Sequence, residues 1–349
     1  MNAAREERRR LRLSERAAIS AGRLLPAAAI ARAAAGGSCL LPYYHVVSDE
    51  WLPHVSPLYR FRSVREFHAD LEFLLRHYQP VGLAELLAAP GRPPHSLLLT
   101  FDDGFREIHD VIAPILRAKG VPAAFFLTSG GLGNQLLCAH QKTALLLDRL
   151  AAGVSATTRA EIGHLVGAPP GTEANLAVAL RKLGHRDTAL IDAVGAVIGI
   201  DFAGFLASAQ PYLTEEQARS LLAQGFELGA HSIDHPLYSQ LSVEEQLRQT
   251  RDSMASLQER LGLKRRVFAF PHSDDGVSAA FFTRLAADGG MEATFGTSAP
   301  HLDPTPRHFQ RFSMEKEGMS AAAILAHQAI RRAKQRVAGS RPLQRDGFS

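Results

Sequence analysis

Two aspartates, Asp102 and Asp103, stand side by side at the end of the apolar run "SLLLTF" (residues 96–101) and directly before Gly104. A continuous apolar run of this length is typical of a strand that is covered on both faces. The carboxyl ends of such strands carry the chemistry in α/β barrels. Two adjacent carboxylates repel each other unless a cation holds at least one of them, so the pair indicates a cation site. The Asp-Gly dipeptide alone is also a common turn signal.

A histidine pair follows a second apolar run, "FELGA" (residues 226–230). His231 and His235 lie four residues apart in "HSIDHP", so one turn of helix would aim both imidazoles at the same point. Imidazole together with carboxylate suits a divalent metal of the zinc type. A histidine pair at this spacing is by itself often a surface coincidence. Together with the aspartate pair, it predicts a bound divalent metal, with Zn²⁺ the first choice and Co²⁺ or Ni²⁺ as alternatives.

A third polar segment, "FAFPHSDDG" (residues 268–276), also follows a predicted strand. Asp274 and Asp275 precede a glycine and are most simply turn and helix-cap residues. His272 comes directly after Pro271, and it is either a site-lining residue or a residue of the loop.

The elements that must position these residues alternate along the chain between short apolar runs and helix-period segments. Strands are predicted near residues 38–47, 96–101, 121–129, 226–230, 267–270 and 292–298. Helices are predicted near residues 63–76, 108–119, 214–225 and 242–262, and a further one around Phe281, Phe282 and Leu285. Capping pairs support three helix starts, at Ser63 with Glu66, Thr214 with Gln217, and Ser242 with Glu245. Repeated units of this kind predict a parallel sheet or a barrel.

One region breaks the alternation. Residues from about 130 to 210 are rich in alanine and leucine at helical spacing and contain no convincing strand. We expect several short helices here, which form either a lid over the active face or a purely structural insertion. The expected organisation is a basic N-terminal segment (1–36), a barrel (37–330) that carries this insertion, and a basic C-terminal tail (331–349).

The charge of the 349-residue chain is uneven. Its formal net charge is +4, but residues 1–36 and 331–349 are each +5, which leaves −6 for the remainder. The basic ends are either solvated helices and frayed tails or contacts to an anionic membrane surface. Nucleic-acid binding is not expected, because aromatic residues do not alternate with basic ones in the middle of the chain. The chain has two cysteines, arginines throughout the N-terminal segment and no apolar stretch of transmembrane length. We therefore expect a cytoplasmic protein, either free or bound at the periphery of a membrane.

The motifs "TFDDG", "GAHSIDHP" and "FAFPHSDDG", in this order, resemble those of the polysaccharide deacetylases, carbohydrate esterase family 4, also called the nodulation deacetylase homology domain. The resemblance covers about residues 40–313 and is interrupted by the helical insertion. It implies a distorted (β/α) barrel with fewer than eight complete units, and hydrolysis of an N-acetyl group from an amino sugar. It also implies that Asp102 is the general base and that Asp103 joins His231 and His235 as metal ligands.

The sequence departs from that family pattern in two places. Many relatives have an arginine in the third motif that orients the base, but Ala269 stands there, and Arg311 is the candidate to reach in from a later strand. Many relatives also end with a Leu-x-His string whose histidine protonates the leaving amine. Here His327 is in such a string, but its surroundings read as a helix. His45, in "PYYHVV", ranks first as the acid because similar proteins often have a Tyr-His pair at that strand, although a packed or substrate-binding role is open.

The expected function is therefore a metal-dependent hydrolase that removes an N-acetyl group from an amino sugar or glycan precursor. Asp102 would be the base and a metal-activated water the nucleophile. Two alternatives stay open, a non-catalytic glycan-binding barrel and an amide hydrolase that acts on a non-sugar substrate.

Overall fold

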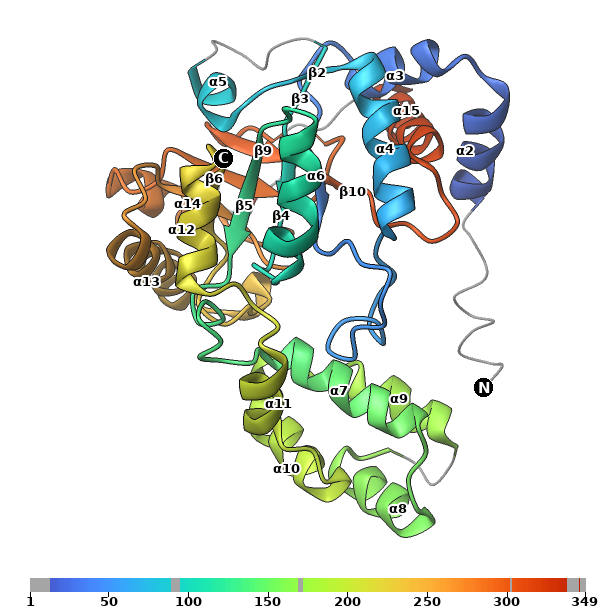
Figure 1. The fold of residues 1–349 in the computed structure, drawn as a ribbon, viewed down its shortest axis with the longest axis vertical. Helices are drawn as coiled ribbons and strands as arrows, with labels where there is room; N and C mark the ends of the chain where they lie inside the picture. Colours follow the sequence, from blue (N-terminus) through green and yellow to red (C-terminus); the bar gives the residue numbers. More distant parts are fainter. Residues whose placement is uncertain (1–12, 89–94, 169–171, 302, 338–344, 346–349) are drawn as a thin grey trace.

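A computed structural model describes residues 13–88, 95–168, 172–301, 303–337 and 345. Eight short strands form one sheet in the order β10-β1-β4-β5-β6-β7-β8-β9, with helices around it (Figure 1). All its pairings are parallel. The strands are β1 (Pro42–Tyr44), β4 (Leu99–Phe101), β5 (Ala123–Leu127), β6 (Glu227–Ala230), β7 (Val267–Ala269), β8 (Ala293–Gly296), β9 (His308–Gln310) and β10 (Phe312–Ser313).

The last strand closes the sheet into a barrel. Only Arg311 separates β9 from β10. β9 pairs with β8, where Thr294 lies opposite His308, and β10 pairs with β1, where Pro42 lies opposite Phe312. Because β9 and β10 are one stretch of chain, the barrel has seven strand segments in the described part of the protein. The expected distorted barrel with fewer than eight complete units is confirmed.

One predicted strand divides between two sheets. Residues 96–101 form β3 (Ser96–Leu97), which pairs with β2 (Gln79–Pro80) in a separate two-stranded sheet, and then β4 of the barrel. The amide of Leu98 donates to Leu40 O, and the amide of Leu40 donates to Ser96 O. The run therefore changes its hydrogen-bonding partner at Leu98, and all of it is buried because both sheets are covered.

The helices of the barrel begin largely where capping residues predict them. Ser63 with Glu66 and Thr214 with Gln217 form capping boxes, and Ser242 Oγ accepts from the amide of Glu245. The expected helix at 108–119 differs, since it opens as a π-helical turn and becomes α-helical only near Pro114, which has no amide hydrogen to donate. These elements are α4 (Val64–His77), α5 (Leu83–Ala88), η1 (Ile108–Ile112), α6 (Ala113–Ala118), α12 (Glu215–Ala223), η3 (Tyr238–Gln240), α13 (Val243–Leu261) and α14 (Ala279–Ala287).

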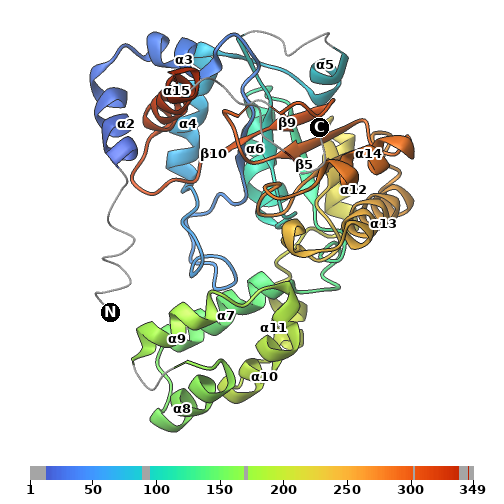
Figure 2. The same cartoon turned by 180° about the vertical axis from the view of Figure 1, so that it is seen from behind.

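The insertion is a helical layer with its own core, beyond the carboxyl end of β5 (Figures 1 and 2). It consists of α7 (Ala139–Ala151), α8 (Ala156–Leu165), α9 (Glu173–Leu180), η2 (His185–Asp187), α10 (Thr188–Ile198) and α11 (Phe202–Ala209). A second apolar cluster, which includes Phe105, Leu137, Leu145 and Tyr212, joins this layer to the barrel.

The N-terminal segment packs against the last helix. α2 (Leu13–Leu24) and α3 (Ala27–Ala35) contact α15 (Ala321–Val337). A Cβ atom added to Gly22 would lie 2.8 Å from Ala323 N, so only glycine allows α2 to approach α15 this closely. Residues 13–36 are therefore part of the folded molecule rather than a frayed tail.

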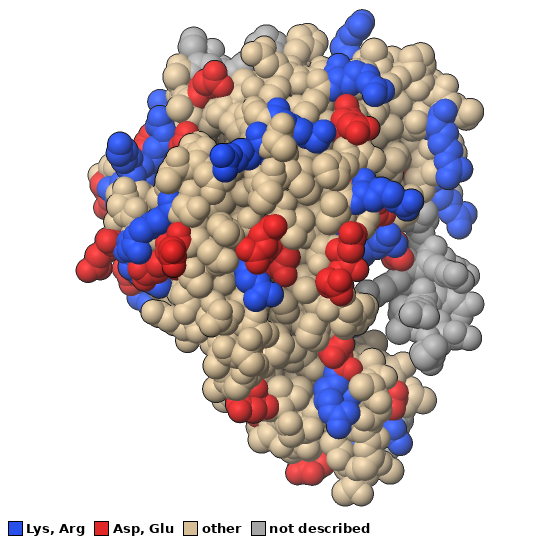
Figure 3. Space-filling view, viewed as in Figure 1, with Lys and Arg blue, Asp and Glu red and all other residues tan. Residues whose placement is uncertain are grey.

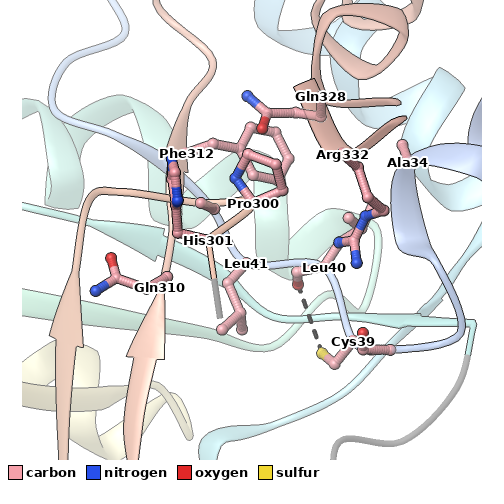
Figure 4. A pocket seen from close by; sticks show the side chains of 12 residues that line it. Ala34, Cys39, Leu40, Leu41, Pro300, His301, Gln310, Phe312, Gln328 and Arg332 are labelled. Atoms are coloured by element: carbon pink, nitrogen blue, oxygen red, sulfur yellow. Dashed lines mark hydrogen bonds between the residues drawn. The ribbon is translucent and has the colours of Figure 1, made fainter. Parts of the chain in front are cut away.

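A small cavity of about 30 Å³ lies where α3 and α15 meet the start of β1. Figure 4 shows Gln328 and Arg332 of α15 beside Leu40 and Leu41 at this place. Such a volume holds one or two water molecules rather than a substrate. This junction is thus a packed interface at the amino end of β1, away from the residues that follow the strands.

Among the described helices, no single one is long and apolar enough to span a membrane. The segments His185–Ile198 and Phe202–Ala209, bent by 88°, reach that length and hydropathy only when they are taken together.

Candidate active site

The residues with catalytic potential follow the carboxyl ends of neighbouring strands. Asp102 and Asp103 come directly after β4, and His231 comes directly after β6. His45 follows β1, and Glu315 follows β10, which pairs with β1. Because these strands run parallel, their carboxyl ends lie at one end of the barrel. The fold therefore gathers residues that are far apart in the sequence.

Asp103, His231 and His235 form a compact buried group. Asp103 Oδ1 lies 3.1 Å from His235 Nε2 and 3.4 Å from His231 Nε2. All three residues are buried, and their ligand atoms lie within 4.8 Å of one another. Burial acts to raise the pKa of Asp103, but the adjacent His235 and the contacts to both imidazoles hold it well below its usual range. The carboxyl is therefore ionised and available to a cation.

The donor atoms of this group fit a divalent metal. His231 Nδ1 lies 2.8 Å from the backbone oxygen of Ala269, which can only accept, so the ring carries its proton on Nδ1. In the neutral ring, Nε2 then presents a lone pair to Asp103 Oδ1, and this oxygen has no hydrogen-bond donor among the described residues. A divalent cation between two such lone-pair atoms would satisfy both of them, and a carbonyl that orients a histidine ligand is usual at zinc sites.

The backbone of the site is strained. Asp103 (φ 74°), Ser232 (φ 67°), His235 (φ 63°) and His272 (φ 54°) all lie in the left-handed region that non-glycine residues seldom adopt. This corrects the expectation that a helical turn aims the histidine pair. His231 and His235 lie in an irregular loop instead, and the amide of His235 donates to Ser232 Oγ at 3.0 Å. In this loop the ring centroids of His231 and His235 lie 5.0 Å apart.

Asp102 is held by an arginine from the strand that closes the barrel. Arg311 Nη1 and Nη2 donate to the two oxygens of Asp102 at 2.7 and 2.8 Å. The guanidinium is fully buried and lies over the rings of Tyr43 and Phe126. Burial acts to raise the pKa of Asp102, but the charge and hydrogen bonds of Arg311, together with the nearby His231 and His45, outweigh it and keep the pKa below its usual value. The structure thus brings Arg311 to Asp102 from a later part of the chain, as the sequence analysis expected.

His45 is held by a carboxylate that sequence reasoning missed. Glu315 Oε2 lies 2.5 Å from His45 Nδ1, and Glu315 Oε1 accepts from the backbone amides of His45 and Val46. The Glu315 side chain is only 2% exposed. Burial acts to lower the pKa of His45, but the Glu315 carboxylate opposes it and raises the pKa to about 9. The sequence signal that could have identified Glu315 is its position two residues after Ser313, at the end of the last strand.

Two further histidines border the metal-type group. The ring of His272 lies 4.4 Å from that of His235, so the structure places His272 at the site. His140, in the first turn of α7, lies 5.2 Å from the ring of His272 and 6.2 Å from that of His235. Sequence reasoning missed His140. The insertion follows the carboxyl end of β5, so its first helical turn had to lie near the strand ends.

The insertion also contacts the loop that carries His235. His185 Nε2 lies 2.8 Å from a carboxylate oxygen of Asp234, and Gln249 Nε2 donates to the other oxygen at 2.8 Å. Asp234 is thus fixed from the insertion on one side and from α13 on the other. Both contacts tie the lid-like helical layer to the loop of a candidate metal ligand.

His327 lies elsewhere. It is buried within α15, the helix that packs against α2, α3 and α4, rather than at a strand end. The helical interpretation of the Leu-x-His string therefore agrees with the structure.

Asp274 begins a turn, as its sequence suggested, because the amide of Val277 donates to Asp274 O, but its side chain does more than form a turn. It is fully buried, and its carboxylate contacts His308, Gln310 and Arg345 at 2.6 to 3.1 Å. The guanidinium of Arg345 also binds Asp303. Asp274, Asp303 and His308 have metal-ligand spacing, but Arg345 already supplies the positive charge, so this group is a buried ion-pair network. Arg345 is therefore not available to a membrane.

A closed parallel barrel with a carboxylate pair and two imidazoles at its strand ends defines the class of the protein. The family model of polysaccharide deacetylases matches residues 90–293, and the chain belongs to this family. Comparison with curated protein sequences gave no match.

Solved structures show the same fold. The chain is 14% identical to the Streptococcus pyogenes deacetylase PplD, solved in complex with acetate, with a TM-score of 0.51 over 83% of this chain and 98% of that one. It is 18% identical to IcaB from Ammonifex degensii, with a TM-score of 0.50 over 84% and 98% of the two chains. A de-N-acetylase from Aggregatibacter actinomycetemcomitans gives 16% identity and a TM-score of 0.50 over 82% and 99%. At these identities the likeness concerns the fold.

Proposed function

We propose that the protein is a metal-dependent hydrolase that removes an N-acetyl group from an amino sugar or a glycan precursor. Its membership of the polysaccharide deacetylase family supports N-deacetylation. The observation that carries the proposal is the pair of adjacent aspartates with different partners. Asp103 faces two imidazoles, whereas Asp102 faces a guanidinium.

Asp103, His231 and His235 would hold the metal, most simply Zn²⁺. When bound there, a divalent ion lowers the pKa of water and polarises the amide carbonyl. Because Asp103, His231 and His235 are only three ligands, they would leave further coordination positions of the metal open to water and to the substrate carbonyl.

Asp102 is suited to take the proton of the attacking water. An amide resists hydrolysis, so the water must lose its proton as it attacks, and an ionised carboxylate beside it can accept that proton. The two hydrogen bonds from Arg311 fix the plane of the carboxylate and keep it ionised. Arg311 therefore acts as a positioning residue for the base.

His45 is suited to give a proton to the leaving amine. An amine leaves readily only when it is protonated, and imidazolium is a suitable donor near neutral pH. Glu315 holds Nδ1, which leaves Nε2 of His45 free to face the substrate. His272 and His140 border the group of candidate metal ligands and would contact the substrate.

The test is acetate release from a panel of acetylated amino sugars, from monosaccharide to short oligomers, by the wild-type protein and by Asp102→Asn. Activity of the wild type that is lost in the variant supports the proposal. Binding of the oligomers without acetate release would indicate a glycan-binding barrel. Release only from acetylated non-sugar amides would indicate the other alternative and overturn the sugar assignment.

A further inference from the structure

Helix α3 is apolar on both of its faces. Ile30, Ala31, Ala34 and Ala35 are buried on one side. On the opposite side Ala28, Ala29 and Ala33 are exposed, and Arg32 is the only charged residue of the helix. A surface helix normally presents polar residues to water, so the composition of this outer side is not explained by the packing of the chain.

The apolar side continues into the turn between α2 and α3. Leu24 is 82% exposed and Leu25 is 55% exposed, and Pro26 follows them on the surface. The corner between the two helices therefore presents two adjacent large apolar side chains to solvent. We call the surface formed by Leu24, Leu25, Pro26, Ala28, Ala29 and Ala33 the outer face of α3.

Positive charge surrounds the outer face of α3. Arg16, Arg23 and Arg32 are exposed on α2 and α3, and Lys334 and Arg336 are exposed on α15. Glu15 is the single acidic residue within the bounds of these three helices. Figure 3 shows Lys and Arg side chains along the edge of the molecule that α2 occupies in Figure 1. In the sequence ahead of α2, five more arginines stand against two glutamates.

We propose that the outer face of α3 docks on an anionic lipid bilayer. Apolar side chains enter the boundary between headgroups and acyl chains, while arginines around them bind lipid phosphates. The guanidinium matches phosphate in a bidentate manner, which suits arginine better than lysine for this role. A second copy of the chain is a poorer partner, because a symmetric contact would bring these positive surfaces against each other.

Docking in this way leaves the candidate active site open. In Figures 1 and 2, α3 and the helical insertion lie at opposite ends of the molecule. The catalytic candidates follow the carboxyl ends of the strands, and His235 among them lies 6.2 Å from the ring of His140 in the insertion. The substitutions that test the outer face of α3 therefore touch no residue of the proposed chemistry. The proposal does not depend on the proposed function, and its test needs no substrate.

The experiment is co-sedimentation of the full-length protein with vesicles of phosphatidylcholine alone or mixed with phosphatidylglycerol. We expect binding only to the mixed vesicles, and release as NaCl rises from 0.1 to 1 M, where the screening length falls from about 10 to about 3 Å. The variant Arg16→Gln/Arg23→Gln/Arg32→Gln should weaken the partition on the order of a hundredfold, since each basic residue contributes about fivefold. Leu24→Glu/Leu25→Glu should abolish binding.

Matched controls separate this face from a general charge effect. Leu165→Glu/Val178→Glu places the same two new charges at apolar positions of α8 and α9 that are 36% and 46% exposed, and Arg65→Gln/Arg76→Gln/Arg117→Gln removes three exposed arginines from α4 and α6. Both controls should bind nearly as the wild type does. Equal binding of wild type to neutral and mixed vesicles, or none to either, overturns the proposal. Concentration-dependent dimers that Leu24→Glu/Leu25→Glu disrupts, without vesicle binding, would assign the face to a second copy and overturn it as well.

Discussion

Arg311 holds both carboxylate oxygens of Asp102, although 209 residues separate the two in the sequence. The pair is almost completely removed from solvent, with side-chain exposures of 0% and 2%. A planar guanidinium fixes the plane of the carboxylate, which a single point charge cannot do. The orientation of the proposed base is therefore set by the strand that closes the barrel.

Arg311→Met is expected to lower kcat about 100-fold without loss of metal, because a base displaced by about 1 Å no longer meets the attacking water. Arg311→Lys keeps the charge without the fork, so its kcat should fall between those of the wild type and Arg311→Met. Acetate-release kinetics and elemental analysis of the purified variants measure the two quantities.

The control for this prediction is Arg62→Met. Arg62 forms another buried pair, with Asp70 at 2.8 Å, and breaking either pair leaves a buried carboxylate without its cation. Both variants should lose about 3–5 kcal/mol in the free energy of unfolding by urea. Only Arg311→Met should lose kcat at temperatures where both are folded. An equal loss of kcat in both would show that destabilisation, not positioning, is responsible.

The strand ends could be predicted from the sequence because each is an apolar run followed at once by polar residues. Asp102, Asp103 and His231 are identified in this way, since the relevant signal is local. His45 was also placed correctly at the end of the first strand. Their arrangement around one centre follows from a single rule, that parallel strands end on the same side.

The partners of these residues could not be predicted, because they depend on which segments pair across the barrel. Glu315 reaches His45 only because β10 lies beside β1, and His140 reaches the site only through the placement of the insertion. The burial of Asp274 was not predicted for the same reason. "SDDG" is locally a turn, whereas its burial comes from His308 and Arg345, which are distant in the sequence.

Removing a metal ligand should remove both metal and activity. Asp103→Ala and His235→Ala are expected to bind well under one divalent ion per chain and to be inactive. Asp102→Asn should keep the metal and lose turnover, because it removes a base without removing one of the three converging ligands. Elemental analysis after dialysis distinguishes these outcomes. Unchanged metal content in the two ligand variants would refute the assignment of the site.

The buried network around Asp274 should make stability sensitive to acid. Burial acts to raise the pKa of Asp274, but contacts led by His308 hold the pKa well below its usual range. Because the folded-state pKa lies below the unfolded value of about 3.9, the stabilisation is present above about pH 4 and is lost as pH falls further. Asp274→Asn should be less stable at pH 7 and should show a shallower decline between pH 5 and pH 3 in urea titrations.

Asp275→Asn is the matched control for Asp274→Asn. Asp275 is the next residue along the chain but is exposed, with one contact from Ser298 Oγ. It should change the unfolding free energy by less than about 0.5 kcal/mol. Arg345→Met, which breaks the network from its other side, should cost about 3–5 kcal/mol. Equal effects of the two asparagine variants would contradict the role of the network.

Glu315→Gln should move the alkaline limb of the pH–rate profile to lower pH. The Glu315 carboxylate raises the pKa of His45 to about 9 against the effect of burial, and glutamine keeps the shape without the charge. Loss of an adjacent opposite charge lowers a pKa by about 1–3 units, so the limb should shift by that amount while metal content stays constant. Profiles of kcat/KM for wild type and variant measure the shift.

The contact between His45 and Glu315 also predicts that the stability of the protein depends on pH. Because the folded-state pKa of His45 is raised above about 6.5, the stabilisation from Glu315 is full below about pH 6.5 and is lost as pH rises through about 9. The stability difference between wild type and Glu315→Gln should therefore be larger at pH 6 than at pH 10.

His45→Ala should retain metal but lose two to four orders of magnitude in turnover, roughly the range of general acid catalysis. His327→Ala, in α15, should leave the profile unchanged; if it abolished the alkaline limb while His45→Ala preserved it, the proton donor would be His327 and not His45.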